Sequence, residues 1–255
     1  MKSWLLNWGF ITVFVFAGQN DTSLSFDTSE GTLISVDVSP NGKTIAFDLL
    51  GHIYLMPSSG GAAEAITKGT SWNMLPRFSP DGEKILFTSD RSGSDDLWIQ
   101  NIKTGNMKNV SKMDIPVHQG TWSTDGNHVF GTALNLKVRH PVYRFNMYGK
   151  KQEIIPAGSR APVNHFAMHP TNHLIYFSHG DGPLYRSGDR IKTYNVKNGE
   201  IKTYIDRAGG AANPTLSKDG KFLAYVLSLI HISEPTRLLS IGEAGVSGEK
   251  KKGGA

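Results

Sequence analysis

The feature that most constrains the fold of this chain is a short turn that recurs five times. The copies are Ser39-Pro40-Asn41-Gly42, Ser79-Pro80-Asp81-Gly82, Ser123-Thr124-Asp125-Gly126, His169-Pro170-Thr171-Asn172 and Ser217-Lys218-Asp219-Gly220. Their first residues are 40, 44, 46 and 48 positions apart. Asn-Gly or Asp-Gly between two apolar runs is a strong hairpin signal, because glycine adopts the positive φ that such turns need. The spacing therefore predicts a repeated antiparallel unit.

The most complete copy of the unit spans residues 76–110 and holds three strand-like runs with their turns. A period of about 40–45 residues with four short strands is typical of propeller blades. A single small sheet cannot bury both of its faces, whereas stacked sheets in a ring bury them against each other. We therefore predict an all-β fold, a β-propeller of four-stranded blades that is truncated, with four whole blades and part of a fifth.

Residues 1–18 have the pattern of a signal peptide. Lys2 precedes an apolar stretch that runs from Trp4 to Phe16 and is followed by small residues. This stretch is too short for a comfortable membrane span, so we expect cleavage, with an uncleaved anchor as the alternative. Both versions predict export, to the periplasm or the medium, and no stable membrane span after signal removal. Residues 19–226 are then the incomplete propeller.

Residues 227–255 do not continue the repeat. The eleven residues from Leu227 to Arg237, LSLIHISEPTR, resemble the translation of a transposase adapter used in sequencing libraries. Residues 249–254, EKKKGG, are what a run of A followed by a run of G would encode. We interpret residues 227–255 as a non-biological, adapter-derived tail and exclude it from the fold prediction. The alternative is a natural strand with a basic tail.

Composition excludes several classes of site. The chain has no cysteine, so it carries no disulfide framework and no cysteine-based zinc site. Its net charge of +5 is scattered, which is too weak a signal for nucleic-acid binding. The Gly-x-Ser-x-Gly motif of a serine hydrolase does not occur in the sequence. We therefore expect no catalytic, cofactor-binding or metal-binding residue in this chain.

Two clusters of ionisable residues could still form a site. Four histidines, at positions 165, 169, 173 and 179, fall within fifteen residues, and imidazole is a common metal ligand. They flank the fourth turn, however, and a hairpin would separate their side chains. Asp90, Asp95 and Asp96 surround a loop that could bind calcium, but the EF-hand spacing is absent. We interpret these carboxylates as acceptors for loop hydrogen bonds.

The second copy of the repeat holds a set of residues that is typical of one family of propeller repeats: Pro76, Phe78, Ser79, Asp81, Gly82, Phe87, Ser89, Arg91, Gly93, Asp96 and Trp98. With these residues it resembles the TolB-type, WD-like propeller repeat of bacterial exported proteins, a resemblance that extends over residues 32–226. Residues 30–57, with the following Gly60-Gly61, and residues 72–78 resemble exported proteins in which such a propeller precedes a metal-dependent amidohydrolase barrel.

The resemblance implies the N-terminal propeller of an exported amidohydrolase-superfamily hydrolase, which scaffolds or gates a catalytic barrel that this chain lacks. In that family a divalent metal, expected to be zinc, is bound on the barrel by a His-x-His pair. Outside the tail no such pair follows the fourth blade. The expected partners are the C-terminal catalytic domain in cis and a protein or peptide ligand on the propeller face. Two alternatives are a TolB-like periplasmic protein-binding propeller and the propeller of a prolyl-oligopeptidase-type serine peptidase.

Overall fold

The computed structural model describes residues 34–134, 140–155, 164–179, 190–206, 210–217, 219–227 and 239–243. They all lie in one compact unit, Leu33–Ala255. The predicted signal peptide, residues 1–18, lies outside the described residues. The described residues form strands and connecting turns, with no helix among them.

The strands form five antiparallel sheets in chain order, each a meander that runs from an innermost to an outermost strand. Blade 1 holds β1 (Val36–Val38), β2 (Thr44–Leu49), β3 (His52–Pro57) and β4 (Glu64–Ala65). Blade 2 holds β5 (Asn73–Phe78), β6 (Lys84–Ser89), β7 (Asp96–Asn101) and β8 (Met107–Asn109). Blade 3 holds β9 (Val117–Trp122), β10 (His128–Ala133), β11 (Val142–Asn146) and β12 (Lys151–Ile155).

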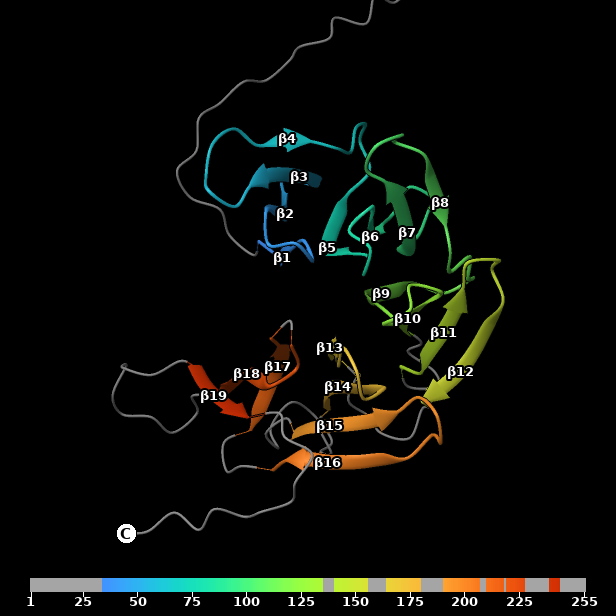
Figure 1. Ribbon diagram of the computed structural model, residues 1–255. Coiled ribbons are helices and arrows are strands. Elements are labelled where there is room, and N and C mark those ends of the chain that lie inside the picture. The colour runs from blue at the N-terminus through green and yellow to red at the C-terminus, as the bar shows by residue number, and fades with distance from the viewer. Residues whose placement is uncertain are drawn as a thin grey trace, which may run out of the picture. The chain divides into compact units, whose positions relative to one another are not determined.

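Blade 4 holds β13 (Asn164–Met168), β14 (Leu174–His179), β15 (Arg190–Asn195) and β16 (Ile201–Ile205). Blade 5 has three strands, β17 (Ala211–Leu216), β18 (Phe222–Leu227) and β19 (Leu239–Glu243). Figure 1 shows the sheets following one another in an arc. The all-β prediction of four four-stranded blades and part of a fifth is confirmed. β19 falls within residues 227–255, whose interpretation as an adapter-derived tail stays a prediction.

The apolar core lies between the blades. Four buried clusters each join one blade to the next, and successive residues of a middle strand face opposite neighbours. On β6, Leu86 packs toward blade 3, while Ile85 and Phe87 pack toward blade 1. Because both faces of β6 are covered, Ile85–Ser89 are all buried. This explains why the middle strands are nearly continuous apolar runs, where a half-exposed strand would alternate cleanly.

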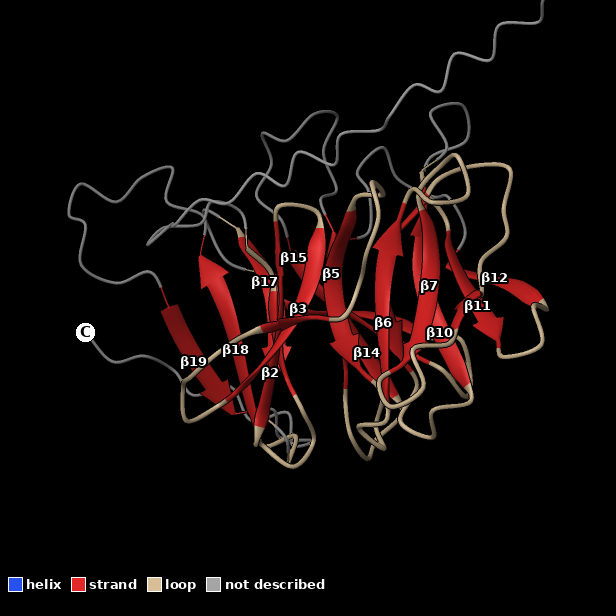
Figure 2. Ribbon diagram, turned by 90° about the horizontal axis from the view of Figure 1, so that it is seen from above, coloured by secondary structure: helices blue, strands red, loops and turns tan. Residues whose placement is uncertain are grey.

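The recurring turn also joins neighbouring blades. A side-chain carbon added at Gly82 would lie 3.3 Å from Cδ of Pro40 in the preceding turn, and one at Gly126 would lie 3.7 Å from Cδ of Pro80. In the four turns that begin with serine, this residue closes the hairpin, as Ser79 Oγ does by accepting the Lys84 N–H at 2.9 Å. Figure 2, a quarter turn from Figure 1, shows the connecting turns gathered at the two ends of the strands. The repeat motif is thus both a hairpin turn and an inter-blade contact.

Candidate functional site

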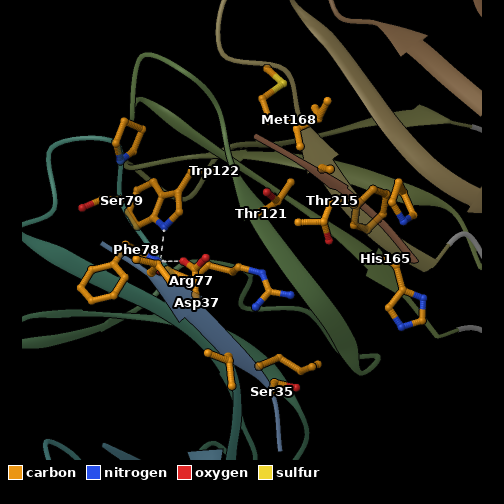
Figure 3. Close-up of a pocket in the computed structure, with 18 of the residues that line it drawn as sticks. Ser35, Asp37, Arg77, Phe78, Ser79, Thr121, Trp122, His165, Met168 and Thr215 are labelled. Carbon is orange, nitrogen blue, oxygen red and sulfur yellow. Dashed lines mark hydrogen bonds between the residues drawn. The ribbon is translucent and has the colours of Figure 1, made fainter. Parts of the chain in front are cut away.

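The innermost strands of all five blades line one cavity, which we call the axial cavity. Its volume is about 740 Å³, and its lining comes from residues of β1, β5, β9, β13 and β17 and from the turns that follow the first four of them. Figure 3 shows side chains from several of these strands pointing into the same space. Each blade therefore contributes the same part of its repeat to this surface.

In four of the five blades the residue four positions before the turn has an unusual backbone. In blades 2 to 5 this residue has φ between 52° and 59° and lies at an irregularity in the pairing with the next strand. A positive φ is uncommon outside glycine and costs about 1–3 kcal/mol when the surrounding structure imposes it. The four residues are Leu75, Gln119, His165 and Asn213. A β-bulge with a strained residue therefore recurs along the cavity wall.

Backbone N–H groups at these bulges donate to the preceding blade, outside their own ladder. Asp48 of blade 1 accepts the Leu75 N–H at 2.7 Å with Oδ2 and the Ser35 N–H at 2.8 Å with Oδ1. The corresponding bonds run from His165 N–H to Gln119 Oε1 at 2.8 Å and from Asn213 N–H to Ser178 Oγ at 2.8 Å. These inter-blade bonds offset part of the strain and fix the cavity wall.

The ionisable residues of the cavity lining are Asp37, Arg77 and His165. Asp37 and Arg77 lie two positions before their turns in blades 1 and 2. The Phe78 N–H donates to Asp37 Oδ2 at 2.7 Å, across the blade boundary. Burial raises the pKa of Asp37, and the charge of Arg77 acts in the opposite direction. The Trp122 Nε1–H donates to the Arg77 carbonyl at 3.2 Å, so blade 3 fixes the backbone that carries this guanidinium.

Sequence patterns did not single out Asp37 and Arg77, although a signal was available. Both occupy the position two before the recurring turn, where the other blades have Thr121, Ala167 and Thr215. Aligning the five turns would have placed this position on the wall of one shared channel, since a propeller directs the innermost strands of its blades to its axis.

The four clustered histidines lie at separate places. His165 is exposed on β13 and His179 ends β14, the antiparallel partner strand, while His173 precedes β14. His169 is buried in the turn, where its Nδ1 accepts the N–H groups of Thr171 and Asn172, each at 3.2 Å. Its ring thus stands at the serine position of the other turns but accepts different N–H groups, and the Leu174 N–H donates to Asn172 Oδ1 at 3.0 Å. Within the described ranges no three His, Asp or Glu side chains gather as a metal site requires.

The three aspartates around the loop of blade 2 have different partners. Asp96 is buried and accepts from Ser92 Oγ at 2.6 Å, Ser111 Oγ at 2.5 Å and Asn109 Nδ2 at 2.8 Å. Asp90 accepts the Trp72 N–H at 2.8 Å, and Asp95 contacts His118 Nε2 at 2.8 Å. Asp90 and Asp96 thus accept hydrogen bonds from the loop and the adjoining strands, in keeping with their interpretation as loop acceptors.

The sequence and the fold are similar to those of known proteins. Residues 13–184 match the family described as the TolB beta propeller domain, PD40. The chain belongs to the TolB beta propeller family. Its fold is similar to the crystal structure of TolB from Acinetobacter baumannii, with a TM-score of 0.65 and 22% identity over 83% of this chain and 52% of that one.

Two curated relatives have names that refer to proteolysis. The chain is 24% identical over 187 residues to the uncharacterized peptidase YuxL of Bacillus subtilis, covering 73% of this chain and 26% of that protein. It is 30% identical over 88 residues to tricorn protease homolog 1 of Streptomyces coelicolor, covering 34% of this chain and 8% of that protein. The chain thus spans about a quarter of one relative and less than a tenth of the other. A search of the described residues for a helix long and apolar enough to cross a membrane found none.

Proposed function

We propose that this chain is the propeller part of a larger exported hydrolase that cleaves amide bonds. The axial cavity admits a flexible peptide segment, and the chemistry takes place in a catalytic domain outside these 255 residues. The observation that carries this proposal is the cavity itself, to which all five blades contribute their innermost strands. Its volume of about 740 Å³ lies in the range of about 300–1,000 Å³ that ligand sites commonly have.

The catalytic domain has two candidate classes. The resemblance of residues 30–57 and 72–78 favours a metal-dependent amidohydrolase barrel, which would bind a divalent metal, expected to be zinc, with its own residues. The names of the Bacillus and Streptomyces relatives favour a peptidase. In both classes the propeller acts as a scaffold and gate, and the described residues of this chain gather no set of metal ligands through which a step could run.

A TolB-like protein-binding propeller is the second candidate function. The similarity of the fold to TolB of Acinetobacter baumannii favours it, because fold likeness extends over 83% of this chain. In this alternative a protein partner binds to the propeller and no hydrolase domain follows. Both candidates place the chain in the periplasm or outside the cell, in keeping with the signal pattern of residues 1–18.

The experiment that tests these proposals is to sequence the source gene past the codon for Val226. A His-x-His motif after further blades supports the amidohydrolase, and Gly-x-Ser-x-Gly supports the peptidase. A stop codon soon after the last blade supports the binding module and contradicts the hydrolase. The same determination tests whether residues 227–255 derive from an adapter. The purified 255-residue chain should show no hydrolysis of peptide or amide substrates, and turnover by it would overturn the proposal.

A further inference from the structure

The guanidinium of Arg77 is available for a ligand. Its Nη1 donates to the Pro76 carbonyl at 2.8 Å, and within the part of the chain that the structure describes it forms no ion pair. Figure 3 shows the side chain extended into the axial cavity. Arginine has five N–H donors in a planar fork, which matches a carboxylate in a bidentate arrangement. Most of this donor capacity faces the cavity.

Asp37, the acidic residue of the cavity lining, is a weak competitor for Arg77. Asp37 influences the charge of Arg77, but its Oδ2 already accepts the Phe78 N–H at 2.7 Å, which fixes the carboxylate against blade 2. Burial also disfavours its charged form. The cavity therefore presents one fixed positive charge that Asp37 does not neutralise by direct contact.

The rest of the wall suits the end of a peptide. Neutral polar side chains of Ser35, Thr121 and Thr215 line the cavity beside apolar groups such as Phe166 and Met168. Figure 3 shows Thr121 and Thr215 on the side toward which Arg77 extends. Arg77 is the penultimate residue of β5, and it lines the wall of the axial cavity. A flexible chain end can enter this cavity to meet the guanidinium more readily than an acidic side chain held on a folded surface.

We propose that the axial cavity binds peptides by their C-terminal carboxylate and that Arg77 is the anchoring residue. The inference rests on the proposed function, in which a peptide segment enters this cavity. It adds the chemical group that is recognised. A single guanidinium beside a carboxylate favours a monoanion over phosphate, which carries between one and two negative charges near neutral pH and would be repelled more strongly by Asp37.

The test is isothermal titration of the full chain with matched peptides. The probes are Ala-Ala-Phe-Ala-Ala as the free acid, as the C-terminal amide and as the N-acetylated acid, together with inorganic phosphate. The same titrations are repeated on the protein from the complete gene. The free acid should bind about 10- to 100-fold more tightly than the amide, since charge-assisted pairs are worth about 1.5–3 kcal/mol. N-acetylation should change the affinity by less than about threefold.

Substitutions at Arg77 test whether this residue causes the preference for the free acid over the C-terminal amide. Arg77→Gln should abolish the difference between acid and amide, whereas Arg77→Lys should retain part of it. Arg144→Gln, which removes the contact of Nη2 with Gln152 on the outer strands of blade 3, is the matched control and should leave the difference unchanged. Asp37→Asn should tighten binding of the acid, because a neighbouring negative charge is lost.

Several results would overturn the inference. They are equal affinity for acid and amide in the unsubstituted chain, a preference that survives in Arg77→Gln, loss of binding on N-acetylation, and phosphate binding as tight as the peptide acid. Equal affinity for acid and amide is measured on the unsubstituted chain, so the proposal can be tested even if a variant misfolds. A gene without a hydrolase domain would overturn the proposed function and leave the acid preference intact, so the two failures are distinguishable.

Discussion

Blades 1 and 2 have nearly the same turn and the same strand order, yet they differ in burial. In blade 2 the middle strand β6 is covered on both faces, and Ile85–Ser89 are buried. In blade 1 only Ala46 and Asp48 of β2 are buried. Ile34, just before β1, is 38% exposed, and Val36 and Val38 on β1 are 55% and 50% exposed. The difference lies in the neighbours, since blade 2 packs against blades 1 and 3. A blade of this repeat is therefore stabilised mainly by the blades beside it.

The largest expected difference between the two blades is the loss of stability when an apolar side chain is truncated to alanine. Leu86→Ala should destabilise the chain by about 2–5 kcal/mol, because Leu86 is fully buried between blades 2 and 3. Val36→Ala, on the open face of blade 1, should change stability by less than about 0.5 kcal/mol. Urea midpoints of the two variants measure the contrast. Similar losses for both would show that β1 is covered in solution.

The glycines of the recurring turns should differ in how much a substitution by alanine destabilises the chain. Gly42 and Gly220 both have φ of +73°, but an added Cβ meets nothing within 4 Å at Gly42 and lies 2.7 Å from the His169 ring at Gly220. Gly42→Ala should cost about 1–2 kcal/mol for the left-handed backbone alone. Gly220→Ala should cost about 1–3 kcal/mol more, because it also overpacks the contact between blades 4 and 5.

Thermal or urea unfolding of both glycine variants gives the comparison, with Gly82→Ala expected between them. Equal destabilisation of all three would contradict the inter-blade role of the turn.

His169 adds a pH dependence that the serine turns lack. Burial lowers the pKa of His169 below the ordinary value of 6.5, and its Nδ1 accepts two backbone N–H groups in the neutral form. Protonation therefore favours the unfolded chain, so this contribution is complete above pH 6.5 and declines as the pH falls through the lowered pKa. His169→Ser, which restores the serine of blade 2, should remove this decline.

The measurement for His169 is urea unfolding at pH 7.5 and pH 5, with a loss about 1 kcal/mol larger in the unsubstituted chain than in His169→Ser. His118, whose pKa burial also lowers, contributes equally to both proteins and cancels in the difference. A loss of the same size in the two proteins would assign the acid sensitivity to other groups.

Substitutions on the open face of blade 1 are expected to have the smallest effect on stability and a clear effect on self-association. Val36→Lys with Val38→Lys should reduce self-association of the chain in sedimentation experiments while changing the unfolding free energy by less than about 0.5 kcal/mol. Tyr148→Lys, at a hairpin tip where the side chain is 91% exposed, is the control and should leave association unchanged. A sharp, monomeric two-state melt of the unsubstituted chain would contradict this account of the open face.

The blade architecture could be predicted from the sequence because the turns that separate the strands are specified by residues close together in the chain. The recurring turns depend on glycine, asparagine and serine within six residues, so their spacing predicts the hairpins and the blade period. The cavity could not be predicted in the same way. The bulges at Leu75 and Asn213 depend on Asp48 and Ser178 in the preceding blades, and a leucine gives no local signal for a positive φ.

Local patterns also explain why the histidines looked like a site. Their closeness in sequence is real, but the antiparallel pairing of β13 and β14 leaves His165 and His179 at the open end of the hairpin and His169 and His173 at its turn end. Conversely, Asp37 and Arg77 are 40 residues apart and share one cavity, because each stands at the same place in its repeat. Position within the repeat, and not distance along the chain, decides which residues meet.

The central claim is that these blades are part of a ring whose remaining blades and catalytic domain lie beyond Val226. Determining the gene sequence past that codon tests it most directly. The account predicts an open reading frame that departs from residues 227–255, with further Ser-Pro-Asp-Gly turns about 40–48 residues apart and then a hydrolase domain. A natural reading frame that encodes residues 227–255 unchanged and then stops would contradict it.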